Sequence, residues 1–316
     1  TILKTLSNIW RKKLKILILG YSKLFRKRIL KTLIKKKIKF YIASKSSPRK
    51  ERKALKWYRD YKSAIENSDA DLVYISLKNS FHYPWAKKAL NYNYHVVVDK
   101  PITETFVQAK ELVRIAKKRK RLLVEATFFN YHRQFKKVFK LFKNKKSIKF
   151  FNSNFIIPFP NNDFFRLDKK KGGGCAMDMG PYAASISRLL GSGKLLSIKS
   201  HVYRNKKGLI ISFDVYCKFK HNKYFGYFSF GGEYKNNLTL FGREIQVELN
   251  NVFSPPSQKN LKILFKKRNN LKITKVRKDN IFENFLKEVL LKLSRKKFDD
   301  FYEKILLDSK FRENIN

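Results

Sequence analysis

Residues 15–25 read KILILGYSKLF, a short aliphatic run that ends in Gly20 and leads into a basic, helix-like segment. Further strand-like runs follow before residue 127, with helical patterns between them. Short strands that alternate with helices indicate βαβ units, in which a parallel sheet is covered on both faces. The first part of the chain is therefore predicted to be a doubly wound α/β domain. Its strand candidates are KILILG (15–20), KFYIAS (39–44), LVYISL (72–77), HVVVDK (95–100) and RLLVEAT (121–127).

The pattern changes after about residue 128. Aromatic-rich strand candidates then follow one another with turns between them, which favours a large, mostly antiparallel sheet. Helical patterns are visible at 181–191 and 280–293. We therefore expect two domains, a doubly wound one over 1–127 and an α+β one over 128–316, which is a natural division for 316 residues. The strand candidates lie at 148–159, 195–205, 209–220, 223–232, 236–242 and 243–250.

The formal charge is +49, because 73 Lys and Arg residues stand against 24 Asp and Glu. Such a charge attracts nucleic acid, anionic lipid or phosphorylated metabolites. The basic residues are spread along the whole chain rather than gathered in one tail. Compositional drift and a selected polyanion interaction both remain open, and drift is favoured. An acid that persists in so acid-poor a chain carries more information than usual.

The two cysteines, Cys175 and Cys217, cannot form a disulfide framework and fit a reducing compartment. No apolar run approaches the roughly 18 residues that a membrane-spanning helix needs. A cytoplasmic protein without a membrane span is expected. The five histidines show neither an i, i+4 pair nor a Cys-His spacing typical of zinc, so no metal site is expected.

The turn after the first strand carries part of a dinucleotide-binding fingerprint. That fingerprint has glycines at its first, third and sixth positions, for a tight turn, close approach of a pyrophosphate and tight helix packing. Gly20, Ser22 and Phe25 occupy those positions here. Ser22 is small enough for a phosphate to approach the helix N-terminus, whereas Phe25 departs from the pattern.

The second strand candidate ends in IASKSSPRK (42–50), without the carboxylate that would bind the ribose hydroxyls of NAD. Ser44, Lys45 and Arg49 are instead suited to the 2′-phosphate of NADP. Basic residues are frequent everywhere in this chain, which weakens the inference. The segment favours NADP over NAD.

Asp99 and Lys100 follow the fourth strand in HVVVDKPIT (95–103). Ligands of open α/β sheets bind beyond the carboxyl ends of the strands, so both residues are placed where a nicotinamide would meet its substrate. A lysine there can hydrogen-bond a hydroxyl or carbonyl oxygen and stabilise developing negative charge. A solvated lysine after a strand fits the spacing equally well.

A glycine-rich segment, GGGCAMDMGPY (172–182), precedes the helix expected at 181–191. Pro181 is suited to the first turn of that helix. Asp178 and Tyr182 are four residues apart and would share a helix face. A tyrosine near a lysine is a plausible proton relay for carbonyl reduction, while a capping aspartate and a core tyrosine are the structural alternative.

Together these segments resemble the Gfo/Idh/MocA oxidoreductase family, in its tyrosine-bearing branch, which is similar to glucose–fructose oxidoreductase and dihydrodiol dehydrogenase. The resemblance covers nearly the whole chain, and the pairing of its aspartate–lysine–proline and glycine-rich motifs is specific. The matching segments are the turn at Gly20, NSFH (79–82), DKP (99–101), EATFFNYH (125–132), GGGCAMDMGPY (172–182) and FSPP (253–256).

The resemblance implies a Rossmann dinucleotide-binding domain over 1–127, joined to a substrate-binding domain over 128–316 whose open sheet often forms oligomers. It implies NADP or NAD as the cofactor. It also implies hydride transfer to or from a hydroxyl or carbonyl of a sugar, nucleotide sugar or polyol. A homodimer or homotetramer is expected.

Carried over by motif, Lys100 binds and polarises the reacting oxygen, Tyr182 donates or accepts the proton, and Asp178 orients the substrate or the proton donor. Arg166 is placed with Asp178 and Tyr182 at the substrate. Asn130 and Arg133 depart from the family's usual Arg and Pro. The implied cofactor-binding residues are Gly20, Ser22, Ser44, Lys45, Asn79, His82, Asp99 and Lys100.

Two other classes of function remain open. One is a Rossmann-type protein without turnover that binds a polyanion such as nucleic acid or membrane lipid, which the net charge motivates. The other binds a dinucleotide without catalysis. The persistence of DKP (99–101) and of the Asp178–Tyr182 pair in a chain with few acids favours an enzyme, and a nucleic-acid partner is not expected.

Overall fold

The computed structural model describes residues 14–45, 51–161, 165–268 and 270–315. Contacts within the chain divide it into two compact units. Unit 1 comprises residues 1–126 and 282–306, and unit 2 comprises residues 127–281 and 307–316. The segment 282–306, which the sequence assigned to the second domain, thus groups with unit 1. The domain boundary at 127/128 stays a prediction.

Unit 1 contains the predicted parallel sheet, with six strands in the order β3-β2-β1-β4-β5-β6. All of its strand pairs are parallel. The order reverses between β1 and β4, so the carboxyl ends of these two strands flank the point where open α/β sheets bind ligands. The strands are β1 (Lys15–Leu19), β2 (Lys39–Ala43), β3 (Trp57–Tyr58), β4 (Leu72–Ile75), β5 (His95–Asp99) and β6 (Leu123–Ala126).

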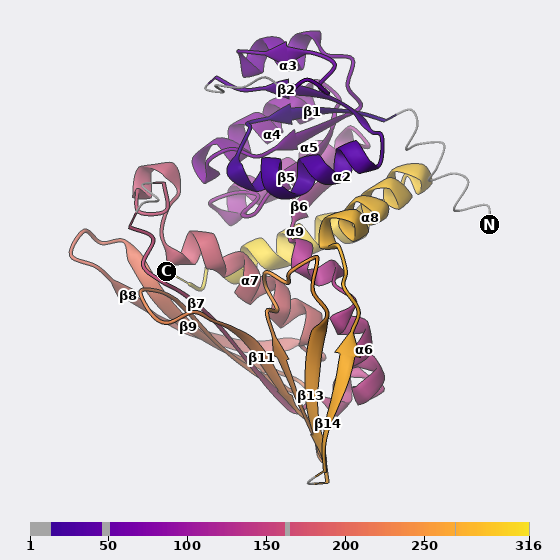
Figure 1. Cartoon of the computed structure of the whole chain (residues 1–316). Coiled ribbons are helices and arrows are strands. Elements are labelled where there is room, and N and C mark those ends of the chain that lie inside the picture. Colours follow the sequence, from indigo (N-terminus) through magenta and orange to yellow (C-terminus); the bar gives the residue numbers. More distant parts are fainter. Residues whose placement is uncertain (1–13, 46–50, 162–164, 269, 316) are drawn as a thin grey trace. The chain divides into compact units, whose positions relative to one another are not determined.

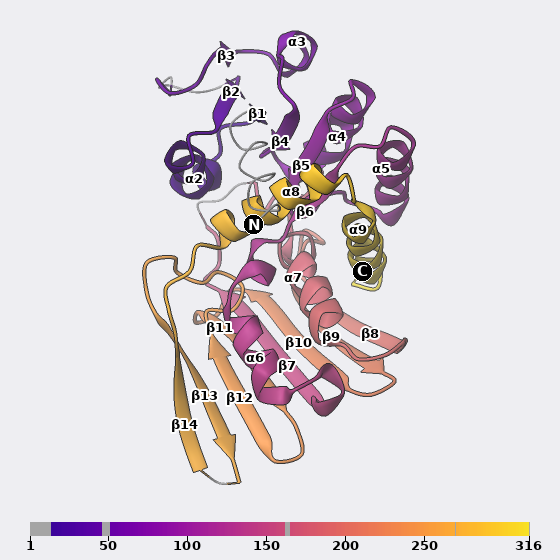
Figure 2. The same cartoon turned by 90° about the vertical axis from the view of Figure 1, so that its right-hand side faces the viewer.

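Helices cover both faces of this sheet, with α2 on one face and α4 and α5 on the other (Figures 1 and 2). The capping box at Thr105 starts α5, because its hydroxyl accepts from the Gln108 N–H while the Gln108 side chain bonds back. The elements are η1 (Phe25–Ile29), α2 (Leu30–Lys35), α3 (Tyr61–Asn67), η2 (Asn79–Phe81), α4 (His82–Asn91), α5 (Phe106–Lys118), α8 (Ile281–Arg295) and α9 (Asp299–Arg312).

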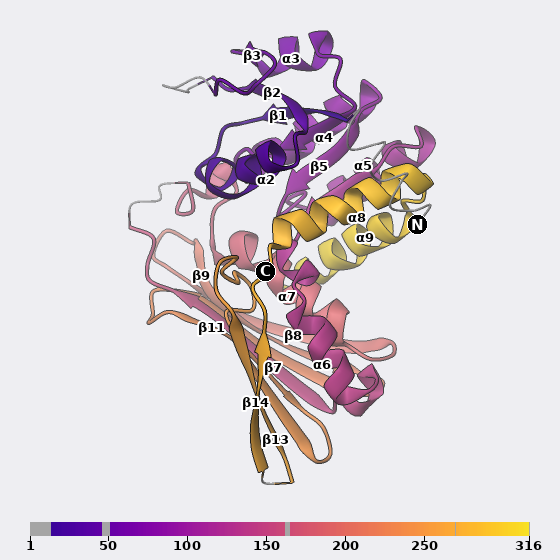
Figure 3. The ribbon, with the colours of Figure 1, turned by 45° about the vertical axis from the view of Figure 1, so that its right-hand side comes forward.

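The segment 282–306 is bound to unit 1 by side-chain contacts. Glu283 of α8 accepts from Lys35 at 2.8 Å and from Lys36 at 3.0 Å, both at the end of α2. The guanidinium of Arg28 lies 5.9 Å from the centre of the Phe282 ring. In Figure 3, α8 begins near α2 and extends away from it. Residues from the far end of the sequence therefore help to cover the parallel sheet.

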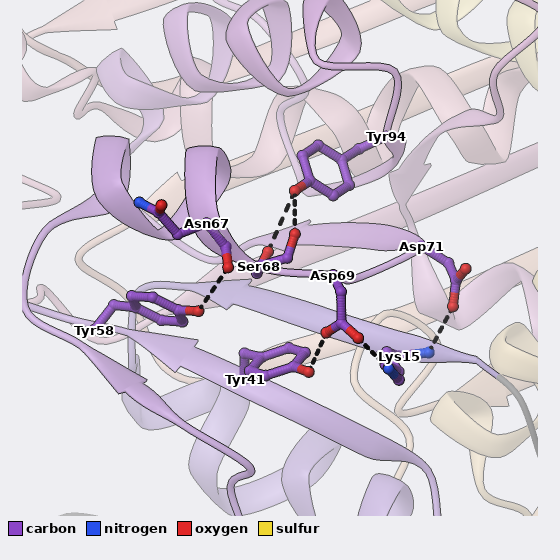
Figure 4. A network of polar contacts seen from close by, with 8 residues as sticks. All are labelled: Lys15, Tyr41, Tyr58, Asn67, Ser68, Asp69, Asp71 and Tyr94. Atoms are coloured by element: carbon purple, nitrogen blue, oxygen red, sulfur yellow. Dashed lines mark hydrogen bonds and ion pairs between the residues drawn. The ribbon is translucent and has the colours of Figure 1, made fainter.

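A polar network joins the amino ends of the strands, at the sheet edge opposite the Gly20 turn (Figure 4). Asp69 accepts from the Tyr41 hydroxyl and the Lys15 ammonium, and the Lys15 N–H donates to Asp71 at 2.8 Å. The Tyr94 hydroxyl donates to the carbonyl of Ile65 at 2.8 Å. The carboxylates of this network therefore hold the connection before β4 against β1 and β2.

Unit 2 contains the predicted, mostly antiparallel sheet, with eight strands in the order β14-β13-β12-β11-β7-β10-β9-β8. The central pair β7–β10 is parallel, and the other pairs are antiparallel. The Lys-rich strands β13 and β14 extend the sheet beyond the predicted strands. The bounds are β7 (Phe150–Ile157), β8 (Leu195–Arg204), β9 (Ile210–Phe219), β10 (Lys223–Phe230), β11 (Lys235–Phe241), β12 (Ile245–Asn250), β13 (Leu261–Lys267) and β14 (Asn270–Val276).

One face of this sheet is covered by α6 (Gln134–Phe142) and α7 (Cys175–Leu190) (Figure 2). An aromatic-rich core lies between them and the inward side chains of the strands. Cys175 and Cys217 are both buried in this core and form no disulfide. Short 3₁₀ turns, η3 (Phe128–Tyr131), η4 (Lys145–Ser147) and η5 (Lys169–Lys171), connect these elements. In the described part of the chain, no helix is both long and apolar enough to cross a bilayer.

Candidate active site

The turn at Gly20 closes over the end of β4. Gly20 has φ of +92°, and a Cβ placed on it would lie 2.3 Å from the carbonyl oxygen of Ser76. A side chain here would meet both an unfavourable backbone conformation and a fixed backbone atom. The glycine thus lets the turn pack directly against the backbone that follows β4.

A directed chain of hydrogen bonds joins the carboxyl ends of β1, β4 and β5. Asp99 accepts from the hydroxyl of Ser76 at 2.7 Å and from that of Tyr74. Because Ser76 donates to the carboxylate, its oxygen accepts from Ser22, which lies 2.7 Å away. The Ser22 oxygen in turn accepts the N–H of Phe25 at 3.0 Å. Ser22 and Asp99 were predicted site residues, and Ser76, which links them, was not.

Burial raises the pKa of Asp99, while the hydrogen bonds from Tyr74 and Ser76 act against that rise. Burial and the nearby Asp99 raise the pKa of Tyr74 well above its ordinary value, so its hydroxyl stays a donor. Asp99 and Tyr74 thus form a buried carboxylate–hydroxyl pair between β5 and β4.

Phe25 does not obstruct the turn. Its side chain is fully buried, with its ring 6.0 Å from that of Tyr74 and 6.1 Å from that of Tyr21. The phenyl ring therefore fills the space between η1 and the sheet, where the family pattern has a small residue. The residues present fit a dinucleotide at this turn.

Asn79 and His82 lie in and just after η2 and are both buried. The two ring nitrogens of His82 face backbone carbonyls, Nδ1 at 2.7 Å from Pro101 and Nε2 at 3.1 Å from Leu77. Burial lowers its pKa, despite these carbonyls. The imidazole thus lies between the segments that follow β4 and β5.

The residues predicted for the adenosine end follow β2. Ser44 is buried, and its N–H donates to the carbonyl of Tyr58 at 3.0 Å. Lys45 is exposed, with its ammonium 5.8 Å from the centre of the Tyr61 ring. Arg49 lies outside the described residues.

Lys100 follows β5 directly, and the backbone after it is anchored. The N–H of Ile102 donates to Glu125 Oε2 at 2.8 Å. Glu125 is a buried residue of β6 that belongs to a predicted motif but was given no role from the sequence. Within unit 1, the structure brings together the strand ends that bear Gly20, Ser22, Asp99 and Lys100.

In unit 2, the three glycines form a tight turn before α7. A Cβ on Gly173 would lie 2.6 to 2.8 Å from the carbonyl oxygens of Phe165, Arg166 and Asp168. The Gly174 N–H donates to the Arg166 carbonyl at 2.8 Å. The absence of side chains on these glycines therefore lets residue 166 reach the first turn of α7.

That turn holds the second group of predicted residues, the α7 cluster of Arg166, Asp178 and Tyr182. Arg166 Nε lies 3.2 Å from Asp178 Oδ2. Asp178 is in the first turn of α7, where a negative charge complements the helix dipole. Tyr182 follows one turn later, so both side chains share a helix face, as predicted.

The Tyr182 ring packs on an aromatic floor. Its centre lies 5.3 Å from those of Phe155 and Phe253 and 5.7 Å from that of Phe129. Phe253 belongs to the FSPP motif, which thus supports the tyrosine. The floor restricts how the ring can turn.

One sequence expectation is wrong here, and the contacts of the two family departures become visible. Pro181 is not in the first turn of its helix, because α7 begins at Cys175. Arg133 binds the buried Asp279 through its backbone N–H at 2.8 Å and its guanidinium at 3.1 Å. Asn130 donates to Ser185 at 2.6 Å. Both family departures therefore make contacts inside unit 2.

Comparisons with known proteins agree with this geometry. Residues 14–127 match the model of the GFO/IDH/MocA family, described as an oxidoreductase family with an NAD-binding Rossmann fold. The chain is 29% identical over 228 residues to dTDP-3,4-didehydro-2,6-dideoxy-α-D-glucose 3-reductase of Saccharopolyspora spinosa, covering 69% of this chain and 68% of that protein. It is 28% identical over 134 residues to D-xylose 1-dehydrogenase (NADP⁺) 2 of Haloferax volcanii, covering 42% and 41%.

Solved structures share the whole fold. A 3-ketoreductase from Actinomadura kijaniata, in complex with NADP and TDP-benzene, has a TM-score of 0.89 at 21% identity, with 96% of each chain covered. The aldose–aldose oxidoreductase from Caulobacter crescentus has a TM-score of 0.81 at 17% identity, covering 95% of this chain and 96% of that one.

Together with the Rossmann sheet, the similarity to sugar reductases and dehydrogenases indicates an NAD(P)-dependent oxidoreductase. Over residues 14–127, the match to the Gfo/Idh/MocA oxidoreductase family agrees with the resemblance that the motifs indicated. An enzyme is thereby favoured over a polyanion-binding protein.

We expect Gly20→Ala to weaken dinucleotide binding about 10-fold or more, because the new Cβ would collide with the Ser76 carbonyl. Gly208→Ala is the matched control, since Gly208 also has a positive φ, of +71°, but a Cβ added there would meet nothing within 4 Å. Fluorescence titration with NADPH measures both. Equal affinity in the Gly20 variant and the natural chain would contradict the assigned turn.

Proposed function

We propose that this enzyme reduces a carbonyl group of a nucleotide-linked sugar, or oxidises the matching hydroxyl, with NADPH or NADP⁺ as the hydride carrier. The observation that carries this proposal is the α7 cluster, in which the Arg166–Asp178 pair lies one helical turn before Tyr182, whose ring packs on the aromatic floor. The nucleotide part of the substrate is supported by similarity to the dTDP-sugar 3-reductase. It is also supported by the fold shared with a ketoreductase that was solved with TDP-benzene.

The reaction needs a hydride and a proton. When bound by the residues proposed below, NADP would supply the hydride-transfer chemistry. For reduction, we propose that the Lys100 ammonium hydrogen-bonds the carbonyl oxygen and stabilises its growing negative charge. The Tyr182 hydroxyl then gives that oxygen a proton, and in the oxidative direction it takes one.

Asp178 has a supporting part in this scheme. Its carboxylate lies one helical turn before Tyr182 and is paired with Arg166 at 3.2 Å. We propose that Asp178 and Arg166 hold a substrate hydroxyl or phosphate oxygen near the phenol. A paired carboxylate and guanidinium offer both an acceptor and donors to a polyhydroxylated ligand.

The cofactor is proposed to be NADP rather than NAD. Lys45 follows β2, with its charge above the Tyr61 ring, and no carboxylate follows that strand at Ser44 or Lys45. A cation at this place favours a 2′-phosphate, whereas an acid would favour the ribose hydroxyls of NAD. The other proposed cofactor contacts are at Gly20, Ser22, Asn79, His82 and Asp99.

A homodimer or homotetramer is proposed to form through the uncovered face of the eight-stranded sheet. Phe225 points to that face, because its neighbours Tyr224 and Gly226 are buried on the helix-covered side. Tyr216 is directly opposite Phe225 in the β9–β10 register, and Tyr203 on β8 is 65% exposed. An exposed group of aromatic residues is typical of a protein interface.

The two cysteines support a reducing compartment. Cys175 and Cys217 are buried thiols, and burial raises the pKa of Cys217 to about 12, so it stays protonated. We therefore propose the cytoplasm as the location.

Lys100→Met and Tyr182→Phe are each expected to lower kcat by roughly 10²–10⁴-fold, because each removes a group that acts on the reacting oxygen. Stopped-flow turnover with NADPH and a dTDP-linked ketosugar measures the loss. Lys118→Met and Tyr92→Phe, at exposed positions of unit 1, are matched controls with unchanged rates. Full activity in both test variants would rule out the catalytic assignment.

NADPH is expected to bind more tightly than NADH in parallel fluorescence titrations. Lys45→Ala should weaken NADPH binding about 10-fold, as expected for loss of one charged hydrogen bond, and leave NADH binding unchanged. Lys62→Ala, at an exposed position of α3, serves as the control. Tighter binding of NADH by the natural chain would reverse the proposed preference.

Phe225→Asp should convert the oligomer to a monomer, because a charge would be buried in the sheet-to-sheet contact. Size-exclusion chromatography with light scattering reports the mass directly. Leu307→Asp, at another exposed apolar position of unit 2, should leave the mass unchanged. A natural chain that is already monomeric at micromolar concentration would contradict the proposed interface.

A further inference from the structure

The backbone around Lys100 is held on both sides by buried side chains. Before it, Asp99 is bound by the hydroxyls of Tyr74 and Ser76. After it, the Pro101 carbonyl lies 2.7 Å from Nδ1 of His82. The next residue, Ile102, is fully buried, and its N–H donates to the Glu125 carboxylate at 2.8 Å. The anchor at Glu125 comes from β6, on the far side of β5 from β4.

Resting on the proposed function, we propose that Glu125 is a positioning residue for Lys100. Its carboxylate fixes the backbone two residues beyond the lysine, and so fixes the direction in which the ammonium leaves the end of β5. A catalytic group has to be held within about 0.5 Å of its productive place, and a misplacement of about 1 Å can cost on the order of 100-fold in rate.

The position of Glu125 in the sheet supports this role. In the register of β5 and β6, Glu125 is the partner of Val98, one residue before Asp99. The residue is only 7% exposed. A buried carboxylate is costly unless its oxygens accept hydrogen bonds, and this chain has only 24 acidic residues. A leucine would fill such a strand position without that cost, but it could not accept the Ile102 N–H.

A purely structural role makes a different prediction. If Glu125 only stabilised unit 1, its loss would lower the melting temperature and leave the rate per folded molecule unchanged. If it acts through Lys100, its loss lowers kcat and spares dinucleotide affinity. The effect should also vanish when Lys100 has already been removed, because residues that act as one unit are not additive.

The experiment is a graded series at position 125, measured with NADPH and a dTDP-linked ketosugar. Glu125→Gln keeps an acceptor oxygen in place and should stay within about threefold of the natural kcat. Glu125→Asp withdraws the carboxylate by one methylene, and Glu125→Leu removes it. We expect losses in kcat of about 10-fold and about 100-fold, respectively, with the dissociation constant for NADPH unchanged. Glu111→Leu, at a partly exposed carboxylate of α5 that pairs with Lys87, is the control.

The decisive comparison repeats Glu125→Asp and Glu125→Leu in the Lys100→Met background, where neither should lower the residual rate further. Equal losses in both backgrounds, or no loss in either single variant, would overturn the inference. If Glu125→Leu does not fold, the Gln and Asp variants still decide the matter, since both keep an acceptor. A fully active Lys100→Met enzyme would instead refute the proposed function, whatever the position 125 variants show.

Discussion

The buried carboxylate of Asp99 is the interaction on which the carboxyl ends of β1, β4 and β5 depend. An ionised carboxylate accepts hydrogen bonds and donates none, so it sets the direction of every hydroxyl that reaches it. Ser76 therefore donates to Asp99 at 2.7 Å, and Ser22 donates to Ser76. Through this order, one acid couples the end of β5 to the end of β4 and to the turn after β1. The Gly20 turn and the Lys100 backbone thus share one anchor.

Other carboxylates in the described chain also accept hydrogen bonds from two donor groups each. Asp279 holds the start of α6 through Arg133, and Asp308 forms two hydrogen bonds, at 2.7 and 2.9 Å, with Arg188 of α7. Asp69 joins two strands of unit 1 through Lys15 and Tyr41. In a chain with three times as many basic as acidic residues, these carboxylates lie where a backbone or side-chain donor needs an acceptor. For the buried Asp279 and Asp308 these contacts offset desolvation, because a carboxylate is costly to bury without such donors.

Sequence patterns predicted the elements whose signal is local. The five buried strands of unit 1 are short, continuous apolar runs, and the glycine turn before α7 is visible as three glycines. Strands β13 and β14 were not predicted, because lysines alternate with their apolar residues and give them a polar appearance. The start of α7 was misplaced because Pro181 suggested a first turn, although the helix tolerates it inside. Proline has no backbone N–H to donate inside a helix, so it is usually found in the first turn. That preference did not locate the start of α7, because its proline lies further along the helix.

Residues whose role depends on a neighbour in space were the harder part of the site. Ser22, Asp99 and Lys100 lie at recognisable strand ends, so their motifs identified them. Ser76 is a small residue directly after β4. Nothing in its local sequence indicates that it links Ser22 to Asp99. Glu125 sits inside a strand where an apolar residue is usual. A buried acid at such a position is itself a signal, since only a nearby donor makes its burial tolerable.

Unit 1 is built from two separate stretches of sequence. The strand ends around Asp99 are therefore not supported by the N-terminal part of the chain alone. Residues 282–306, here called the return segment, supply Glu283, which pairs with Lys35 and Lys36 at the end of α2. They also supply Tyr302, whose hydroxyl donates to the carbonyl of Arg121 just before β6. Phe298 packs on His95, at the first residue of β5, with ring centres 5.7 Å apart. Both β5 and β6 therefore begin against residues of the return segment. Because β5 ends at Asp99 and β6 contains Glu125, the strands that carry the lysine and its support are stabilised by the far end of the chain.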